Sequence, residues 1–156
     1  MKQLPVGKTA PDFSLATVKG EDFRLSEAVA DGPVVLAFYK ASCPTCQLTF
    51  PFLQRIYAES RNNPRLRIVG ISQDEIEETK TFIDQLGIGF EVLIDEHPYA
   101  VSSAYGVEFV PTIFVVGENG KIELSDYGFS KATLSEIGKP GQVFSPNDGL
   151  PATRPG

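Results

Sequence analysis

Cysteine occurs only twice in the 156-residue chain, and both copies lie in the motif Cys43-Pro44-Thr45-Cys46. Two thiols at this spacing can close a small disulfide ring and open it again, which is the chemistry of thiol–disulfide exchange. The motif follows an apolar run at 34–39 and precedes apolar residues at helical spacing, so we expect it at a strand–helix junction. In an α/β pattern, this pair indicates a redox-active dithiol.

The two cysteines are expected to play different parts. At the amino end of a helix, the Cys43 sulfur faces unpaired backbone N–H groups and the positive end of the helix dipole, and both favour the thiolate. Pro44 fits the first helical position because its missing N–H has no intrahelical partner there. Cys46 lies one turn deeper. We therefore expect Cys43 to be the nucleophile and Cys46 the resolving thiol, with the Cys43–Cys46 disulfide as the only redox group and no other cofactor.

Composition limits the classes of function. The chain is 42% hydrophobic and 22% charged, which suits one domain with one core. A net charge of -6 argues against a nucleic-acid partner or an anionic membrane surface, and the one basic stretch, at 61–67, is interpreted as a solvated loop. No signal-like start or membrane-spanning apolar run occurs. We expect a cytoplasmic monomer, or an exported or anchored protein if an N-terminal signal is missing from this sequence.

Strand-like and helix-like patterns alternate along the chain. Apolar, β-prone runs predict buried strands at 34–39, 66–71, 90–95 and 112–116. Helical spacing predicts helices after the dithiol and at 76–86, 98–105 and 130–138. Residues 1–33 indicate a loop-rich layer that bears a strand, and 118–124 indicate a tight turn and a hairpin strand. Ser72 and Glu75 have capping-box spacing. The order of elements predicts an α/β fold with a central mixed sheet flanked by helices.

The segment 139–156 differs from the rest of the chain because prolines and glycines recur through it. Such a segment can form neither a helix nor a central strand. We therefore divide the chain into a folded domain, 1–138, and a tail, 139–156. The tail is expected to be extended and to cross the domain through Val143 and Phe144.

The residues around the dithiol resemble those of thioredoxin-fold proteins, with Pro51 in the following helix and Val110-Pro111-Thr112 opening a late strand. The fuller pattern is similar to the AhpC/TSA, or redoxin, superfamily, close to its TlpA-like thiol–disulfide oxidoreductases, over about residues 5–138. The further motifs that carry this resemblance are Gly7-Lys8-Thr9-Ala10-Pro11-Asp12-Phe13, Ala104-Tyr105-Gly106-Val107 and Val110-Pro111-Thr112-Ile113-Phe114. The resemblance implies that 1–138 is a thioredoxin-like domain with a β-α insertion at about 75–95 and a strand-bearing N-terminal extension.

The resemblance also implies where a partner docks. The matching proline of the family is cis and lies beside the dithiol, so Pro111 is expected to do the same. The preceding residue, Val110, then offers its backbone to an extended partner chain. Together with Pro44 and Thr45, these are the expected substrate-binding residues. The implied activity is reduction or exchange of disulfides in a protein or small-molecule partner, with a thiol or dithiol as the electron partner.

Several positions depart from the family pattern. Ser42 stands where a tryptophan is usual, Ala37 replaces the buried aspartate of thioredoxin, and Thr49 replaces the glutamate of some TlpA-like proteins. The sequence therefore offers no evident general base for Cys46. Lys40 and Thr49 are candidates for electrostatic tuning of the dithiol.

Two other functions fit parts of the pattern. Peroxidases of the superfamily carry Thr or Ser three residues before the reactive cysteine and Pro seven before it, whereas this chain has Lys40 and Leu36. These residues disfavour a peroxiredoxin-like thiol peroxidase. A non-catalytic module could instead dock a protein or hold Cu(I) through Cys43, Cys46 and His97. A closed zinc site is disfavoured because it needs four ligands and His97 is the only histidine.

Overall fold

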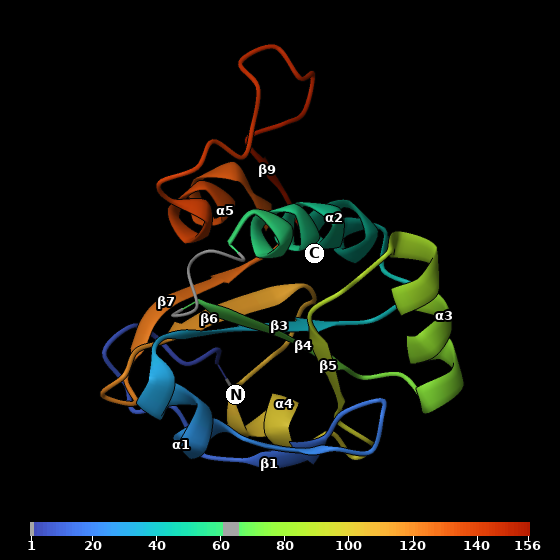
Figure 1. The fold of residues 1–156 in the computed structure, drawn as a ribbon, viewed down its shortest axis with the longest axis vertical. Helices are drawn as coiled ribbons and strands as arrows, with labels where there is room; N and C mark the ends of the chain where they lie inside the picture. Colours follow the sequence, from blue (N-terminus) through green and yellow to red (C-terminus); the bar gives the residue numbers. More distant parts are fainter. Residues whose placement is uncertain (1, 61–65) are drawn as a thin grey trace.

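The computed structural model describes residues 2–60 and 66–156, so residues 61–65 of the predicted basic loop lie outside the described part. Its central strands are β3 Val34–Tyr39, β4 Arg67–Ser72, β5 Glu91–Ile94, β6 Thr112–Val116 and β7 Ile122–Tyr127. They form a five-stranded sheet in the order β5-β4-β3-β6-β7 (Figure 1). Strands β3, β4 and β5 are parallel, whereas β6 is antiparallel to β3 and β7 to β6. The predicted mixed sheet is confirmed.

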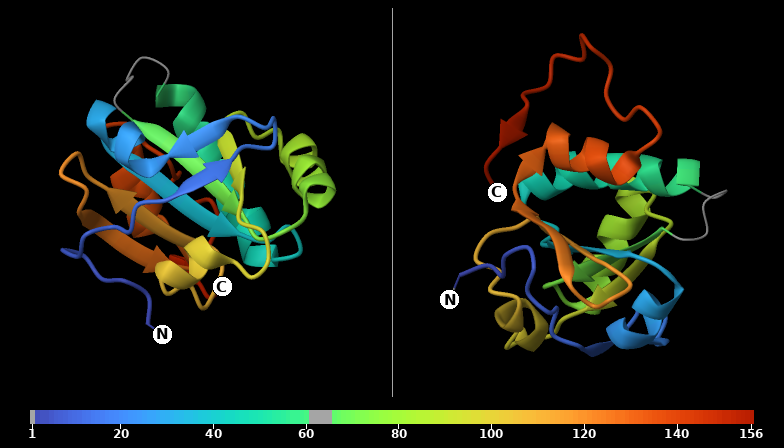
Figure 2. Two further views of the ribbon diagram at one scale, coloured as in Figure 1. Left: turned by 90° about the horizontal axis from the view of Figure 1, so that it is seen from below. Right: turned by 90° about the vertical axis from the view of Figure 1, so that its left-hand side faces the viewer.

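Helices and an N-terminal layer cover the two faces of the sheet (Figures 1 and 2). One face carries α2 Pro44–Glu59, α3 Ile76–Leu86 and α5 Lys131–Gly138. The other carries β1 Ser14–Ala16, β2 Asp22–Arg24, α1 Leu25–Ala28, the 3-10 helix η1 Val29–Asp31 and α4 Ala100–Ala104. This is the thioredoxin fold with its N-terminal extension and the α3–β5 insertion, as predicted.

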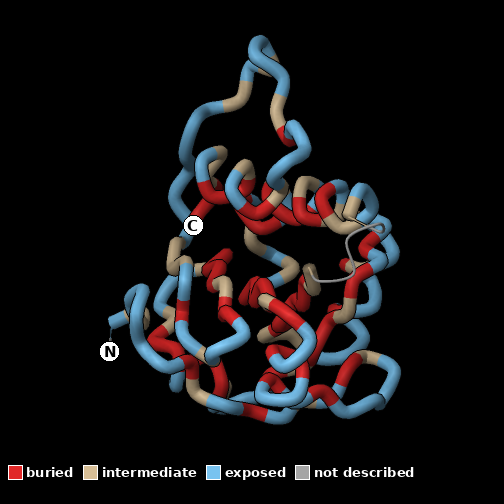
Figure 3. Tube along the Cα trace, turned by 60° about the vertical axis from the view of Figure 1, so that its left-hand side comes forward, coloured by how far each residue is buried: buried red, intermediate tan, exposed pale blue. Residues whose placement is uncertain are grey.

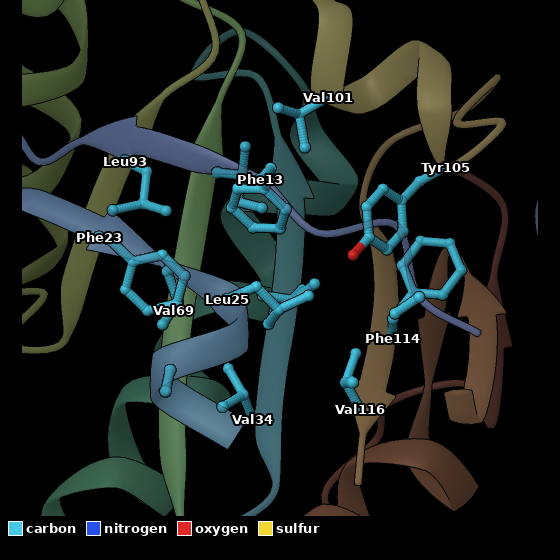
Figure 4. Close-up of a cluster of buried hydrophobic side chains, with 14 of the residues drawn as sticks. Phe13, Phe23, Leu25, Val34, Val69, Leu93, Val101, Tyr105, Phe114 and Val116 are labelled. Carbon is cyan, nitrogen blue, oxygen red and sulfur yellow. The ribbon is translucent and has the colours of Figure 1, made fainter. Parts of the chain in front are cut away.

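Strand β3 is the middle strand of the sheet, and all six of its residues are buried. Its side chains alternate between the faces of the sheet, so Phe38 and Tyr39 belong to different hydrophobic clusters. In the cluster under the N-terminal layer, Phe13 packs edge-on against Tyr105 at 6.0 Å between ring centroids (Figure 4). Buried residues follow the strands and the inner sides of the helices (Figure 3). The two clusters hold the carboxyl end of β3, where the dithiol follows, between rigid layers.

The start of α3 differs from the prediction. Ser72 is the last residue of β4 and pairs with Ile94 of β5, so it remains extended. Glu75 is the N-cap and makes no side-chain cap hydrogen bond. The predicted capping box is therefore wrong. The buried Ser72 hydroxyl instead lies 2.7 Å from Thr79 Oγ1 and accepts the N–H of Asp74 at 3.0 Å.

The segment after α5 loops away from the domain and then returns to it (Figure 1). Val143 is buried, and the ring of Phe144 packs on Phe52 and Phe129 with centroids 4.7 and 5.9 Å apart. These contacts agree with the expected crossing through Val143 and Phe144. The returning end also forms a short strand that the sequence pattern did not indicate, because β9 Thr153–Arg154 pairs antiparallel with β8 Phe129–Ser130.

Candidate active site

The first cysteine lies where β3 ends and α2 begins. Cys43 is the N-cap of α2, with extended backbone angles, and Pro44 occupies the first turn. The Cys43 Sγ accepts the backbone N–H of Cys46 at 3.2 Å, and the Cys43 N–H donates to the Lys40 carbonyl at 3.2 Å. The sulfur therefore occupies the position at which a helix N-terminus binds negative charge.

The loop before β6 meets this sulfur. The Val110–Pro111 peptide bond is cis, in agreement with the expectation for Pro111. The Cys43 thiol donates to the Val110 carbonyl at 3.4 Å. The partly exposed Cys43 therefore lies between the helix N-terminus and the backbone that was expected to pair with a partner.

The second cysteine is in a different environment. Cys46 is completely buried in the cluster between the sheet and α2. Burial raises the pKa of its thiol strongly, the adjacent Cys43 raises it further, and the backbone of Lys40 offsets part of the rise. At neutral pH the Cys46 side chain is therefore a protonated thiol, shielded from solvent, rather than a thiolate.

An acidic side chain next to the dithiol was missed by the sequence reasoning. The Asp74 carboxylate accepts the Ala41 N–H at 2.6 Å, and its charge contributes to the raised pKa values of Cys46 and Tyr39. Because β3 and β4 are parallel, the residues after both strands meet at one end of the sheet. A carboxylate two residues after β4 was the available signal.

The Tyr39 hydroxyl is buried near Asp74 and has no hydrogen-bond partner among the described residues. The nearby Ser72 hydroxyl is already engaged by Thr79 and by the Asp74 N–H. Burial raises the pKa of Tyr39, the nearby Ser72 hydroxyl offsets part of the rise, and the charges of Asp74 and Cys46 add to it. The surroundings of Cys46 therefore hold a neutral phenol and a carboxylate, which the sequence reasoning did not include.

The remaining candidate residues lie around the dithiol in different ways. Lys40 is exposed and contacts the dithiol through its backbone. The buried Thr49 hydroxyl donates to the Thr45 carbonyl at 2.8 Å, one turn earlier in α2. Ser42 is exposed, and Ala37 is buried within β3. The Thr49 hydroxyl is thus committed to its own helix.

The Cu(I) hypothesis is contradicted by the position of His97. This residue is exposed, and its ring lies against Tyr99 with 5.3 Å between the centroids. Within residues 2–60 and 66–156 there is no cluster of three His, Cys, Asp or Glu side chains that could hold a metal ion. The three ligands were proposed from their softness alone, and the fold does not bring them together.

An exposed aromatic pair adjoins the cis-proline loop. The rings of Phe109 and Tyr127 are stacked with centroids 5.6 Å apart, and their residues are 54% and 53% exposed. Phe109 directly precedes Val110, and Tyr127 pairs with Thr112 across β6 and β7. Exposed apolar surface therefore adjoins the cis-proline loop although Ser42 replaces the usual tryptophan.

A buried thiol one turn behind a partly exposed sulfur has the spacing of a dithiol that can open and close a disulfide. The fold and the site therefore define a thiol–disulfide oxidoreductase of the thioredoxin fold. The chain belongs to the AhpC/TSA family, whose family model matches residues 6–125.

Known proteins with similar sequences and structures agree with this class. Thiol-disulfide oxidoreductase ResA of Geobacillus thermodenitrificans is 31% identical over 119 residues, which cover 76% of this chain and 67% of the relative. The structure of dsbF from Mycobacterium tuberculosis has a TM-score of 0.73 at 25% identity and covers 84% of this chain and 96% of its own. Peroxidoxin BcpB of the same organism has a TM-score of 0.73 at 26% identity, with 88% and 94% covered.

The chain is thus similar both to a protein named a thiol-disulfide oxidoreductase and to one named a peroxidoxin, so the residues around Cys43 must distinguish the two activities. Position 36 in this chain is a buried leucine of β3, and position 40 is an exposed lysine. The peroxidase pattern requires a proline at the first of these positions and a hydroxyl side chain at the second. The peroxidase hypothesis is therefore no better than that of a thiol–disulfide oxidoreductase. Within the described part of the chain, every helix is too short or too polar to cross a bilayer.

Proposed function

We propose that Cys43 attacks a disulfide of a partner protein and that Cys46 resolves the resulting mixed disulfide. The Cys43 thiolate forms a bond to one partner sulfur, the partner S–S bond breaks, and the leaving sulfur takes up a proton. Cys46 then loses its proton and attacks Cys43, which releases the second partner thiol. The partner gains two electrons, and Cys43–Cys46 becomes a disulfide that a thiol or dithiol reduces again.

The observation that carries this proposal is the contrast between the two sulfurs. Cys43 is partly exposed at the helix N-terminus, in contact with the Val110 carbonyl, whereas Cys46 is buried one turn away. An accessible nucleophile with a shielded resolver reacts first with the partner and only then with itself. This order supports the division of roles.

Protein disulfides are the proposed substrates. Val110, Pro111, Pro44 and Thr45 lie together at the dithiol and form the proposed docking element. The exposed stack that begins with Phe109 extends this element with apolar area, which suits a polypeptide better than a small disulfide. No bound cofactor is required for the exchange.

Reduction of insulin disulfides by the reduced protein tests the proposal. Cys43→Ser should abolish turnover because it removes the nucleophile, and Cys46→Ser should accumulate a mixed disulfide that mass spectrometry detects. Thermal unfolding of both variants controls for folding. Turnover in the Cys43→Ser variant equal to that of the unsubstituted protein would refute the assigned roles.

The cytoplasmic location and the monomeric state stay predictions, as does the division into domain 1–138 and tail 139–156. The Pro44-Thr45 pair between the cysteines does not by itself predict the reduction potential of the dithiol or the direction of electron flow. Measuring the reduction potential of the dithiol decides the direction, because about -270 mV is typical of a reductant and about -120 mV of an oxidant. A peroxidase would instead consume peroxide far faster than a free thiol does.

A further inference from the structure

The returning end of the chain lies on the proposed docking element. Pro155 accepts a hydrogen bond from the buried Thr45 hydroxyl at 2.7 Å. Gly156 approaches Val110 so closely that a Cβ at 156 would overlap the Val110 carbonyl. This is the carbonyl to which the Cys43 thiol donates. Figure 2 shows β9 running alongside β8 and ending beside α2. Residues 152–156, called the strap below, thus lie against the backbone that a partner chain would use.

The contact between the strap and the domain is made by backbone atoms. Thr153 and Arg154 pair with Ser130 and Phe129. The N–H of Lys131 also donates to the Ala152 carbonyl at 2.9 Å. On the other side of the contact, Gly128 has a φ of +77°, and a Cβ there would lie 2.5 Å from the Arg154 carbonyl. Such pairing is how an extended peptide is added to a sheet edge, with little dependence on its side chains.

The strap is held weakly. All five of its residues are exposed, so apolar burial contributes little to holding it. Its base is fixed by Asp148, whose carboxylate lies 2.8 Å from the Lys131 ammonium and accepts the Leu150 N–H at 3.0 Å. The side chains of Asp148 and Lys131 are only 18% and 25% exposed, so this ion pair is better shielded from solvent than the strap itself. A few backbone hydrogen bonds and one ion pair can be replaced by equivalent contacts from another chain.

We propose that the surface formed by Thr45, Val110 and β8 binds an extended segment of the partner protein, and that residues 152–156 occupy this surface until the partner displaces them. This rests on the proposed function. The strap acts as an internal competitor that slows the reaction with protein disulfides. A small disulfide reaches the partly exposed Cys43 without backbone pairing and is not affected.

Two variants of the full chain release the strap without touching the dithiol. Asp148→Asn removes the ion pair at its base, and Arg154→Pro removes a backbone N–H from β9. Both should raise kcat/KM for insulin reduction at least about threefold, because the partner then displaces fewer contacts. The rate with hydroxyethyl disulfide should stay unchanged. Glu136→Gln is the control, since it breaks the exposed ion pair with Lys139 and should alter neither rate.

A synthetic peptide of residues 149–156 supplies a second measurement. Added to the Arg154→Pro variant, it should inhibit insulin reduction competitively and leave hydroxyethyl disulfide reduction unaffected. An unchanged or lower rate with insulin in both strap variants, while the unsubstituted protein is active, overturns the strap proposal alone. Failure of the unsubstituted protein to reduce either disulfide overturns the proposed function itself.

Discussion

The stability of the reduced protein should fall at alkaline pH because Cys46 is buried. Burial raises the pKa of its thiol above the ordinary value of 9.0, with a further contribution from Cys43. Above about pH 9, the unfolded chain loses this proton while the folded chain keeps it. The folded state then binds more protons than the unfolded state, so the free energy of unfolding decreases as pH rises. The contribution is fully present below pH 9 and is lost above it.

The size of the effect follows from proton linkage. A group that ionises only in the unfolded chain lowers the free energy of unfolding by about 1.36 kcal/mol for each pH unit above its unfolded pKa. For Cys46, with an unfolded pKa of 9.0, the loss between pH 8 and pH 10 is about 1.4 kcal/mol. This value applies because the Cys46 residue is 0% exposed and its thiol stays neutral in the fold.

Urea denaturation at pH 8, 9 and 10 measures the loss directly. Cys43→Ser serves as the reference because it cannot form the disulfide, and it is compared with the double variant Cys43→Ser/Cys46→Ala. The stability difference between them should shrink by about 1.4 kcal/mol from pH 8 to pH 10. The buried Tyr39 and Tyr105 titrate in both proteins, so their contributions cancel. A difference that does not change with pH would refute the argument from burial.

Three substitutions test other parts of the site and the fold. Asp74→Asn removes a negative charge near Cys46, so the decay of the mixed disulfide should reach its maximal rate at lower pH, and an unchanged pH profile would exclude this role. Phe109→Ala should raise KM for insulin and change the free energy of unfolding by less than about 0.5 kcal/mol, because the side chain is exposed. Substitution of another exposed apolar residue, Val6→Ala, is the control, and an equal rise in KM in both variants would argue against docking at the aromatic pair. Leu53→Ala, in the fully buried face of α2, should lower the free energy of unfolding by about 2–5 kcal/mol in chemical denaturation, and a loss below about 1 kcal/mol would contradict its packing.

Much of the fold could be predicted because its signals are local. The run from Val34 to Tyr39 is apolar at every position, which indicates a strand buried on both faces, and β3 is such a strand. Gly87 ends α3 in the left-handed conformation that glycine adopts without strain. The capping box failed because its serine takes part in strand pairing, which depends on a segment about twenty residues further along the chain.

The site was predictable only in part. The dithiol and the cis-proline loop carry their own sequence motifs, and the structure places them in contact. Asp74 was missed because its nearness to Cys46 depends on the parallel pairing of β3 and β4. The failed Cu(I) ligand, His97, shows the converse, since suitable chemistry along the chain does not by itself bring side chains together.

By itself, the sequence determined the reactive groups of this protein and their local setting. These are two thiols one helical turn apart, a proline at the first helical position, where its missing N–H has no intrahelical partner, and the apolar strand that precedes them. The tertiary structure alone decided that Cys46 is buried while Cys43 is partly exposed, and that residues 152–156 lie against Val110. The physical reason is that solvent exposure and backbone pairing depend on segments far apart in the chain. Local spacing specifies which reaction is available and favours Cys43 as the nucleophile, whereas packing decides how far each sulfur is shielded from solvent and which distant segment lies on the Val110 backbone.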